Sequence, residues 1–283
     1  MLASRDAFSS PKKFCILVWL GRRNNNKHND LIINADKTKI LHICSPLNHD
    51  RQKSLKIVFH SYECLHAMVI GKICMNCDVI IECVDNHVYL GVVIDRFLSW
   101  RPHITTLCKR LRSCAFQLFK LKMVLPFKLL RSVYIAIAES IISYGLLSWG
   151  SASPKHLNLI TNLQNSMIRT ITPYFLKTNP NYNSISMKYN FCNLLPVSHL
   201  FKYRFILKFY FNRIYEVTND ISDKTRWKSR GNHRLPRFNN KYGKRTLFYL
   251  TPEIFNSIPV HIRNLDKISA IKSEIKSYLL DCL

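Results

Sequence analysis

Apolar residues follow two different periods along this chain. From Ile40 to Ile94 they form short runs rich in β-branched residues and separated by turn-like residues, which is the pattern of strands. From Ile104 onward they recur at steps of three and four residues, which is the pattern of amphipathic helices. The sequence therefore predicts an α+β protein in which a small, mostly antiparallel sheet is followed by an antiparallel helical bundle and a basic helical C-terminal region.

The strand-like runs are short and evenly spread. We expect strands at 40–43, 57–59, 68–70, 79–81 and 88–94. Breaks such as Ser45-Pro46 and Gly71-Lys72 separate them. The last run ends in Asp95 and leads into the first predicted helix.

Three helices are expected in the bundle. The second begins at Pro126 and ends near Gly145, and the third begins at Pro154 and is stopped by Pro173. The predicted apolar stripes are Ile104, Leu107, Leu111, Cys114, Leu118 and Leu121 in the first, Leu130, Val133, Ile137, Ile141 and Tyr144 in the second, and Leu157, Ile160, Leu163, Met167 and Ile171 in the third.

These patterns divide the chain into four parts. We expect a poorly ordered lead-in at 1–30, a β region at 31–100, the helical bundle at 101–175 and a basic C-terminal region at 176–283. The last part begins with a polar linker, 177–193, and contains an aromatic basic helix at about 198–217 and a terminal helix at about 269–280.

The charge of the chain is strongly positive and unevenly placed. Lys and Arg number 42 against 17 Asp and Glu, which gives a net charge of +25. Glu139 is the one acid between Asp95 and Glu216, and the stretch from Lys224 to Arg245 has none. A polyanionic partner is the interpretation that this distribution favours.

Location and cysteine chemistry follow from the same composition. No apolar run approaches the roughly 20 residues that span a bilayer, so we expect a soluble, intracellular protein, nuclear or cytoplasmic, without membrane contact. Cys74 and Cys77, with Cys64, Cys83, His66 and His87 nearby, leave two interpretations open: a zinc site, or buried reduced thiols between strands. No metal site is assigned.

Several motifs resemble one polymerase family. The run Tyr89–Asp95, followed by Leu98-Ser99-Trp100 and Pro102-His103, is similar to the region just after the active site in reverse transcriptases of non-LTR retrotransposons of the jockey and CR1 type. The resemblance extends to Asn34-Ala35-Asp36-Lys37-Thr38, Tyr144-Gly145 and Ser148-Trp149-Gly150. It covers residues 31–172 well, and beyond them mainly Leu194-Leu195-Pro196 and residues 254–259.

The resemblance implies a fragment of an RNA-directed DNA polymerase: the edge of the palm, a thumb-like bundle and a basic tail. Such enzymes transfer nucleotides with two divalent metal ions held by converging carboxylates. Residues 1–30 contain neither the family's Asp-Asp hairpin nor its earlier Asp-bearing strand, and no Asp-Asp pair occurs anywhere in the chain. We therefore expect a chain that is catalytically inactive alone and holds no cofactor, whereas a complete polymerase would need Mg²⁺.

The same resemblance suggests candidate site residues. Lys37 matches the lysine that is a general acid toward the leaving pyrophosphate, although a surface lysine in a turn is the simpler interpretation. Tyr89, Leu90 and Gly91 match the segment that grips the primer end, or form an ordinary strand with a tight exit. The nucleic-acid-binding face of the thumb would contain Lys109, Arg110, Arg112, Lys120, Lys122, Lys128 and Arg131. A solvated helix face is the alternative, and the absence of any acid from Arg96 to Arg131 makes it the less favoured interpretation.

Two functional hypotheses result. In the first, the chain binds RNA, DNA or an RNA–DNA hybrid nonspecifically through the phosphate backbone, with the rest of a polymerase as a further partner. In the second, the bundle is a protein-interaction module without a nucleic-acid role, and its partner surface consists of Phe201, Tyr203, Phe209 and Tyr210.

Overall fold

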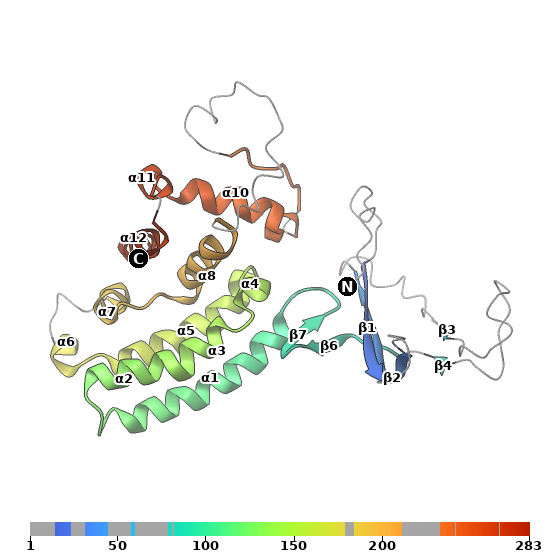
Figure 1. Ribbon diagram of the computed structural model, residues 1–283. Coiled ribbons are helices and arrows are strands. Elements are labelled where there is room, and N and C mark those ends of the chain that lie inside the picture. The colour runs from blue at the N-terminus through green and yellow to red at the C-terminus, as the bar shows by residue number, and fades with distance from the viewer. Residues whose placement is uncertain are drawn as a thin grey trace. The chain divides into compact units, whose positions relative to one another are not determined.

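The computed structural model describes residues 15–23, 32–44, 58–59, 79–80, 82–178, 184–210, 233–240, 242–265 and 267–283 (Figure 1). The chain divides into two compact units, Met1–His103 and Ile104–Leu283. The described strands belong to the first unit, and the second is built from helices. The α+β prediction is confirmed, with helices dominating.

The described strands of the first unit form three small sheets, with the orders β1-β2-β5, β3-β4 and β6-β7. The pairings β1–β2, β3–β4 and β6–β7 are antiparallel, whereas β2–β5 is parallel. The strands are β1 (Cys15–Arg23), β2 (Ile32–Ile43), β3 (Val58–Phe59), β4 (Val79–Ile80), β5 (Glu82–Cys83), β6 (Asn86–Tyr89) and β7 (Val92–Asp95).

Strand β1 lies within the range for which the sequence suggested a poorly ordered lead-in. It begins with the apolar run Cys15–Leu20 and pairs with β2 from Cys15 opposite Ile43 to Arg23 opposite Ile32. The pairing satisfies backbone donors and acceptors on either side of a register shift between Trp19 and Gly21, which explains why this segment is a strand. The polar run Arg22–His28 prompted the prediction, and its first two residues end β1. Residues 24–30 lie outside the described residues, as does the strand predicted at 68–70.

The apolar run at 88–94 is a hairpin, not one strand. Tyr89 pairs with Val92, and Leu90 and Gly91 form the two-residue turn between β6 and β7. Their φ angles of 47° and 77° are both positive, as the tightest hairpin turns require. Leucine is uncommon at such an angle, so the apolar run gave no sign of the turn.

The second unit contains the predicted bundle. Helices α1, α2 to α3, and α5 run in alternating directions (Figure 1). The described helices are α1 (Arg101–Leu121), α2 (Phe127–Tyr134), the π-helix η4 (Ile135–Glu139), α3 (Ser140–Ser143), α4 (Leu146–Trp149), α5 (Pro154–Ile171), α6 (Tyr174–Thr178), α7 (Ile185–Cys192), α8 (Val197–Phe205), the π-helix η6 (Ile206–Tyr210), the 3₁₀ turn η8 (Gly243–Arg245), α10 (Leu247–Ser257), α11 (Val260–Arg263) and α12 (Ile268–Asp281).

The second helix contains a π turn, η4, and its buried face differs from the predicted one. The amide N–H of Ser140 donates to the carbonyl of Ile135, five residues back, so this turn holds more residues than an α turn. The buried side chains are Leu130, Tyr134, Ala138 and Ile142, at steps of four. The predicted stripe was therefore wrong after Leu130, and its last member, Tyr144, is exposed.

The C-terminal region has more helix than the sequence indicated. The predicted linker 177–193 contains α7, whose first turn is capped by Ser184, the side chain of which accepts a hydrogen bond from the amide of Met187. Tyr189 and Cys192 of α7 are buried, so packing rather than an apolar stripe holds this helix in place. The terminal helix is confirmed as α12, whereas α10 and α11 were not predicted.

A buried glutamine joins three parts of the second unit. The side-chain amide of Gln164, on α5, donates to the hydroxyl of Tyr134 at 3.0 Å and to the carbonyl of Leu195 at 2.9 Å. Its oxygen accepts from the amide of Val197 at 2.8 Å. The side chain is fully buried, and these bonds fix α2, α5 and the start of α8 to one another.

Candidate nucleic-acid interface

Asp95 organises the turn between β7 and α1. Its carboxylate accepts hydrogen bonds from the amides of Ser99 at 3.0 Å and Trp100 at 2.8 Å. Leu98 and Trp100 have positive φ angles of 47° and 63°, which cost energy for residues with a side chain. The buried carboxylate offsets that cost, so the Leu-Ser-Trp motif and its acid form a structural turn.

Further polar contacts fix the β6–β7 hairpin. The guanidinium of Arg96 donates to Asp85 at 2.8 Å and to the sulfur of Cys44 at 3.6 Å. The ring nitrogen Nδ1 of His103 accepts a hydrogen bond from the amide of Val93 at 3.3 Å. These contacts lie within the first unit. They join the hairpin to the end of β2, through Cys44, and to the start of α1, through His103.

The predicted primer-grip residues lie at the tip of this hairpin. Tyr89, Leu90 and Gly91 are all exposed, and Leu90 is exposed by 71% of its surface. The tip is thus accessible to a ligand, and its role in gripping a primer stays a prediction. Lys37 lies in β2, and its side chain is outside the described residues.

The outward face of α1 is basic. Lys109, Arg110, Arg112 and Lys120 are exposed, and the predicted stripe members Ile104, Leu107, Leu111, Cys114 and Leu118 are buried on the opposite side of the helix. Leu121, the last member of the predicted stripe, is half-buried. No acid occurs in α1. Lys122 follows the helix directly and is half-buried, and Lys128 is exposed on α2.

Two exposed aromatic rings lie among these cations. Phe116 and Phe119, on α1, are exposed by 63% and 53%. The ammonium of Lys120 lies 5.4 Å from the ring centre of Phe116, and that of Lys122 lies 4.2 Å from the ring centre of Phe119. Neither ring was predicted from the sequence, although their spacing of four and three residues from a lysine was a usable signal.

Arg131 differs from the other cations of the predicted set. Its Nε donates to the carbonyl of Cys192, and its Nη2 donates to the carbonyl of Asn193 at 3.4 Å. These carbonyls end α7, where a helix has partial negative charge. The structure therefore brings Arg131 together with α7 rather than leaving it fully exposed.

The aromatic surface of the protein-interaction hypothesis is only partly present. Phe201 is buried, with its ring centre 5.7 Å from that of Phe205, so the prediction that it is exposed was wrong. Tyr203 is half-buried, and the side chains of Phe209 and Tyr210 lie outside the described residues.

Metal ligands and membrane spans can be assessed for the described ranges only. In those ranges no three His, Cys, Asp or Glu side chains gather in a way that could hold a metal ion. Cys74 and Cys77 lie outside them, and Cys83 is exposed. Among the described helices, none combines the length and apolar character needed to cross a bilayer.

Curated proteins similar to this chain are polymerases of mobile elements from fruit flies. The chain is 33% identical over 94 residues to "Probable RNA-directed DNA polymerase from transposon BS" of Drosophila melanogaster, and the matched region covers 31% of this chain and 10% of that protein. It is 29% identical over 156 residues to "Probable RNA-directed DNA polymerase from transposon X-element" of the same species, and this match covers 53% of this chain and 16% of that protein. It is 34% identical over 97 residues to "RNA-directed DNA polymerase from mobile element jockey" of Drosophila funebris, and this match covers 32% of this chain and 10% of that protein.

These matches span between 10% and 16% of the relatives' own lengths. No family model matches the chain. No solved structure matches it either. The comparisons confirm a distant, partial similarity to reverse transcriptases of non-LTR retrotransposons, and the chain is related to mobile-element RNA-directed DNA polymerases.

Proposed function

We propose that this chain is a thumb-containing part of a non-LTR reverse transcriptase and that it binds template and primer through the exposed face of α1. The observation that carries the proposal is the basic, acid-free surface of that helix, with Lys109, Arg110, Arg112 and Lys120 exposed. The similarity to mobile-element polymerases makes a nucleic acid the expected polyanion.

Phosphate contact follows from the chemistry of this face. Lys and Arg side chains on one side of a helix neutralise successive backbone phosphates and release bound counterions, without reading the base sequence. Phe116 and Phe119 add rings on which unpaired bases can stack. The proposed ligand is therefore RNA, DNA or their hybrid, bound with little sequence preference.

Nucleotide transfer is not assigned to this chain by itself. Two Mg²⁺ ions, held by converging carboxylates, would supply that chemistry in a complete polymerase. The residues proposed for this chain bind and orient the strands, and Lys37, in β2, is proposed as a proton donor only in the context of such an enzyme.

Charge reversal on α1 tests the proposal. The triple variant Lys109→Glu, Arg110→Glu, Arg112→Glu replaces exposed cations without touching the buried stripe. We expect its affinity for a fluorescent RNA–DNA hybrid, measured by anisotropy at low salt, to fall at least about a hundredfold, because several phosphate contacts are lost.

A matched triple variant controls for net charge. Lys155→Glu, Lys267→Glu and Lys272→Glu change the same number of exposed cations, on α5 and at α12 rather than on α1. We expect only a small loss of affinity from it. An equal loss in both variants would show that net charge rather than α1 binds the hybrid.

The protein-interaction alternative now rests on a different observation. Met123 and Val124, in the turn after α1, are exposed by 79% and 81%, which is unusual for large apolar side chains. Unchanged hybrid binding by the α1 variant, together with loss of a protein partner, would favour this alternative.

A further inference from the structure

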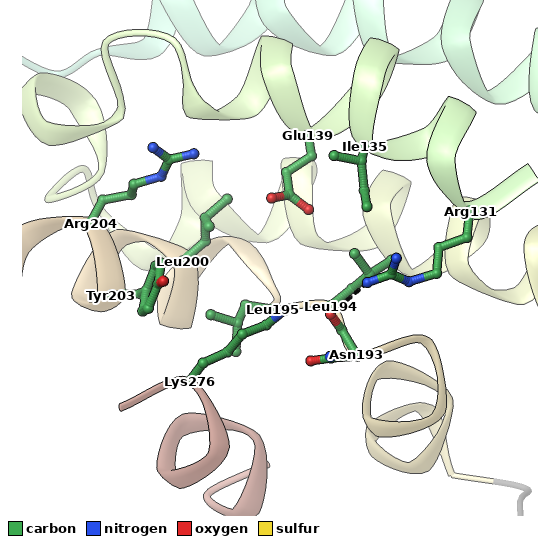
Figure 2. A pocket seen from close by; sticks show the side chains of 10 residues that line it. All are labelled: Arg131, Ile135, Glu139, Asn193, Leu194, Leu195, Leu200, Tyr203, Arg204 and Lys276. Atoms are coloured by element: carbon green, nitrogen blue, oxygen red, sulfur yellow. Dashed lines mark hydrogen bonds between the residues drawn. The ribbon is translucent and has the colours of Figure 1, made fainter. Parts of the chain in front are cut away.

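A charged cavity lies in the second unit, away from the α1 face. It has a volume of about 190 Å³ and is formed where η4, the turn after α7, α8 and α12 meet (Figure 2). Leu194, Leu195 and Leu200 supply apolar walls, and the polar side chains at the cavity are Arg131, Glu139, Asn193, Tyr203, Arg204 and Lys276.

Positive charge is in excess around this cavity. Arg131, Arg204 and Lys276 approach it from three separate elements, and Glu139 is the one acid that lines it (Figure 2). Among the described residues, no ion pair within 4.0 Å joins Glu139 to any of these cations. The three cations thus line one cavity without a carboxylate in direct contact.

Burial and neighbouring charges shift the pKa values of two side chains that line the cavity. The pKa of Lys276 is lowered, first by burial and then by repulsion from Arg131. Burial also raises the pKa of Glu139, although all three cations oppose the rise. An anion in the cavity would relieve the repulsion between Lys276 and Arg131.

We propose that this cavity is a binding site for a phosphate group, held by Arg204, Lys276 and the remaining donors of Arg131. A guanidinium has five donors, and Arg131 uses two of its nitrogens on the end of α7. Guanidinium groups donate in pairs to phosphate oxygens, and the ammonium adds a point charge.

Size and charge both favour phosphate. Three cations against one carboxylate leave two positive charges, which matches a phosphate dianion. A volume of about 190 Å³ exceeds that of several water molecules, each of which occupies about 30 Å³ in the liquid. A tetrahedral anion fits there with a few waters. Binding of a nucleotide's phosphate would not require its base to enter the cavity.

Phosphate titration of the full chain tests the site. We expect inorganic phosphate to bind, by calorimetry or ³¹P NMR, and we expect Arg204→Gln and Lys276→Gln each to weaken binding about tenfold or more, the effect of losing one hydrogen bond to a charged group. Glu139→Gln should bind phosphate more tightly than the unaltered chain, because it removes the one repelling charge.

Lys272→Gln is the matched control, since Lys272 is an exposed lysine one turn before Lys276 on α12 and does not line the cavity. Its phosphate affinity should equal that of the unaltered chain. Absence of phosphate binding, or equal binding by the Arg204→Gln, Lys276→Gln and Lys272→Gln variants, would overturn the proposal.

The phosphate could be free or could end a nucleic-acid strand, and a second pair of titrations separates these sources. An RNA with a 5′-phosphate that binds more tightly than its 5′-hydroxyl counterpart, with the difference lost in Arg204→Gln, would support a strand end. Equal binding of the two RNAs, with inorganic phosphate still bound, would support the free ion. The triple α1 variant should keep its phosphate binding, so the site stands or falls separately from the α1 interface.

Discussion

Single polar side chains hold much of the backbone near the proposed interface. Asp95 accepts two amide hydrogen bonds from the turn that precedes α1, and Gln164 makes three bonds in the core of the second unit. The indole of Trp149 is fully buried and donates to the carbonyl of Tyr144 at 3.0 Å. Several residues that carry the family resemblance thus have structural roles.

Replacing Gln164 should destabilise the second unit. The variant Gln164→Met keeps the length of the side chain but leaves the Tyr134 hydroxyl, the Leu195 carbonyl and the Val197 amide without this partner. We expect the free energy of unfolding to fall by about 3 kcal/mol, because buried polar groups lose their hydrogen bonds. Urea unfolding followed by circular dichroism measures it, with the exposed Asn162→Met as control, and equal stability of the two variants would contradict this role.

The effect of Glu139 on the free energy of unfolding should depend on pH. Burial raises the pKa of Glu139 above its ordinary 4.5, so the folded protein binds this proton more readily than the unfolded chain does. Stability is therefore lost as pH rises from 4.5 through the raised pKa. Glu139→Gln removes that loss, and we expect it to raise the melting temperature at pH 7 but not at pH 4.

Thermal unfolding in phosphate-free buffers at the two pH values checks this prediction. Glu274→Gln, at an exposed position on α12, is the control and should show no such dependence. A Glu139→Gln variant whose advantage over the unaltered chain is the same at both pH values would refute it.

The sequence could not reveal these roles at the scale of single residues. Gln164 stands beside the polar residues Asn162, Asn165 and Ser166, and its neighbours along the chain do not mark it as the buried one. The role of Arg131 depends on the end of α7, because its partner Cys192 lies 61 residues later in the chain. The α1 cations were predictable because an apolar stripe fixes the opposite face of the same helix.

Close packing between α4 and α8 requires glycine at position 150. A Cβ atom on Gly150 would lie 2.3 Å from the ring of Phe201 and 2.6 Å from the carbonyl oxygen of Leu146. We expect Gly150→Ala to lower the free energy of unfolding by about 2–3 kcal/mol, as overpacked cores do. Denaturant unfolding measures the loss. Ser148→Ala, exposed on the same helix, should change stability little, and equal effects would argue against tight packing here.

The aromatic rings of α1 should distinguish single strands from duplexes. Phe116→Ala with Phe119→Ala removes two exposed rings but no charge. We expect affinity for single-stranded RNA to fall about tenfold or more, since base stacking on an aromatic ring contributes about 1–3 kcal/mol, whereas duplex binding changes little. Anisotropy titrations compare the two ligands. Leu129→Ala, also an exposed apolar residue, is the control, and an equal loss for both ligands would contradict stacking.

Helix existence was predictable in the bundle, but the phase of the second helix was not. The buried residues are one position later than predicted from Tyr134 onward, before the π turn at Ile135–Glu139 begins, because Tyr134 rather than Val133 packs into the core. Helix α7 was missed because it lacks an apolar stripe and depends on packing against α5 and α12. The hairpin turn at Leu90 was missed because the sequence offers a leucine where turns favour Asn or Gly.

At the scale of the whole molecule, the order of the elements was a reliable signal. The change from short strands to amphipathic helices near residue 100 predicted the α+β class, which the structure confirms. The excess of 42 Lys and Arg over 17 Asp and Glu predicts a polyanionic partner, and that partner stays a prediction. The four-part division of the chain stays a prediction, and the structure itself divides into Met1–His103 and Ile104–Leu283.

The salt dependence of hybrid binding tests the central claim most directly. Affinity of the full chain for an RNA–DNA hybrid is measured between about 50 and 200 mM salt, beside the triple variant Lys109→Glu, Arg110→Glu, Arg112→Glu. We expect a steep linear fall in log affinity with log salt concentration, and a slope shallower by about 2–3 in the variant, because each lost phosphate contact removes about 0.7–0.9. Binding that ignores salt, or equal slopes for the two proteins, would contradict the claim that α1 lies against a phosphate backbone.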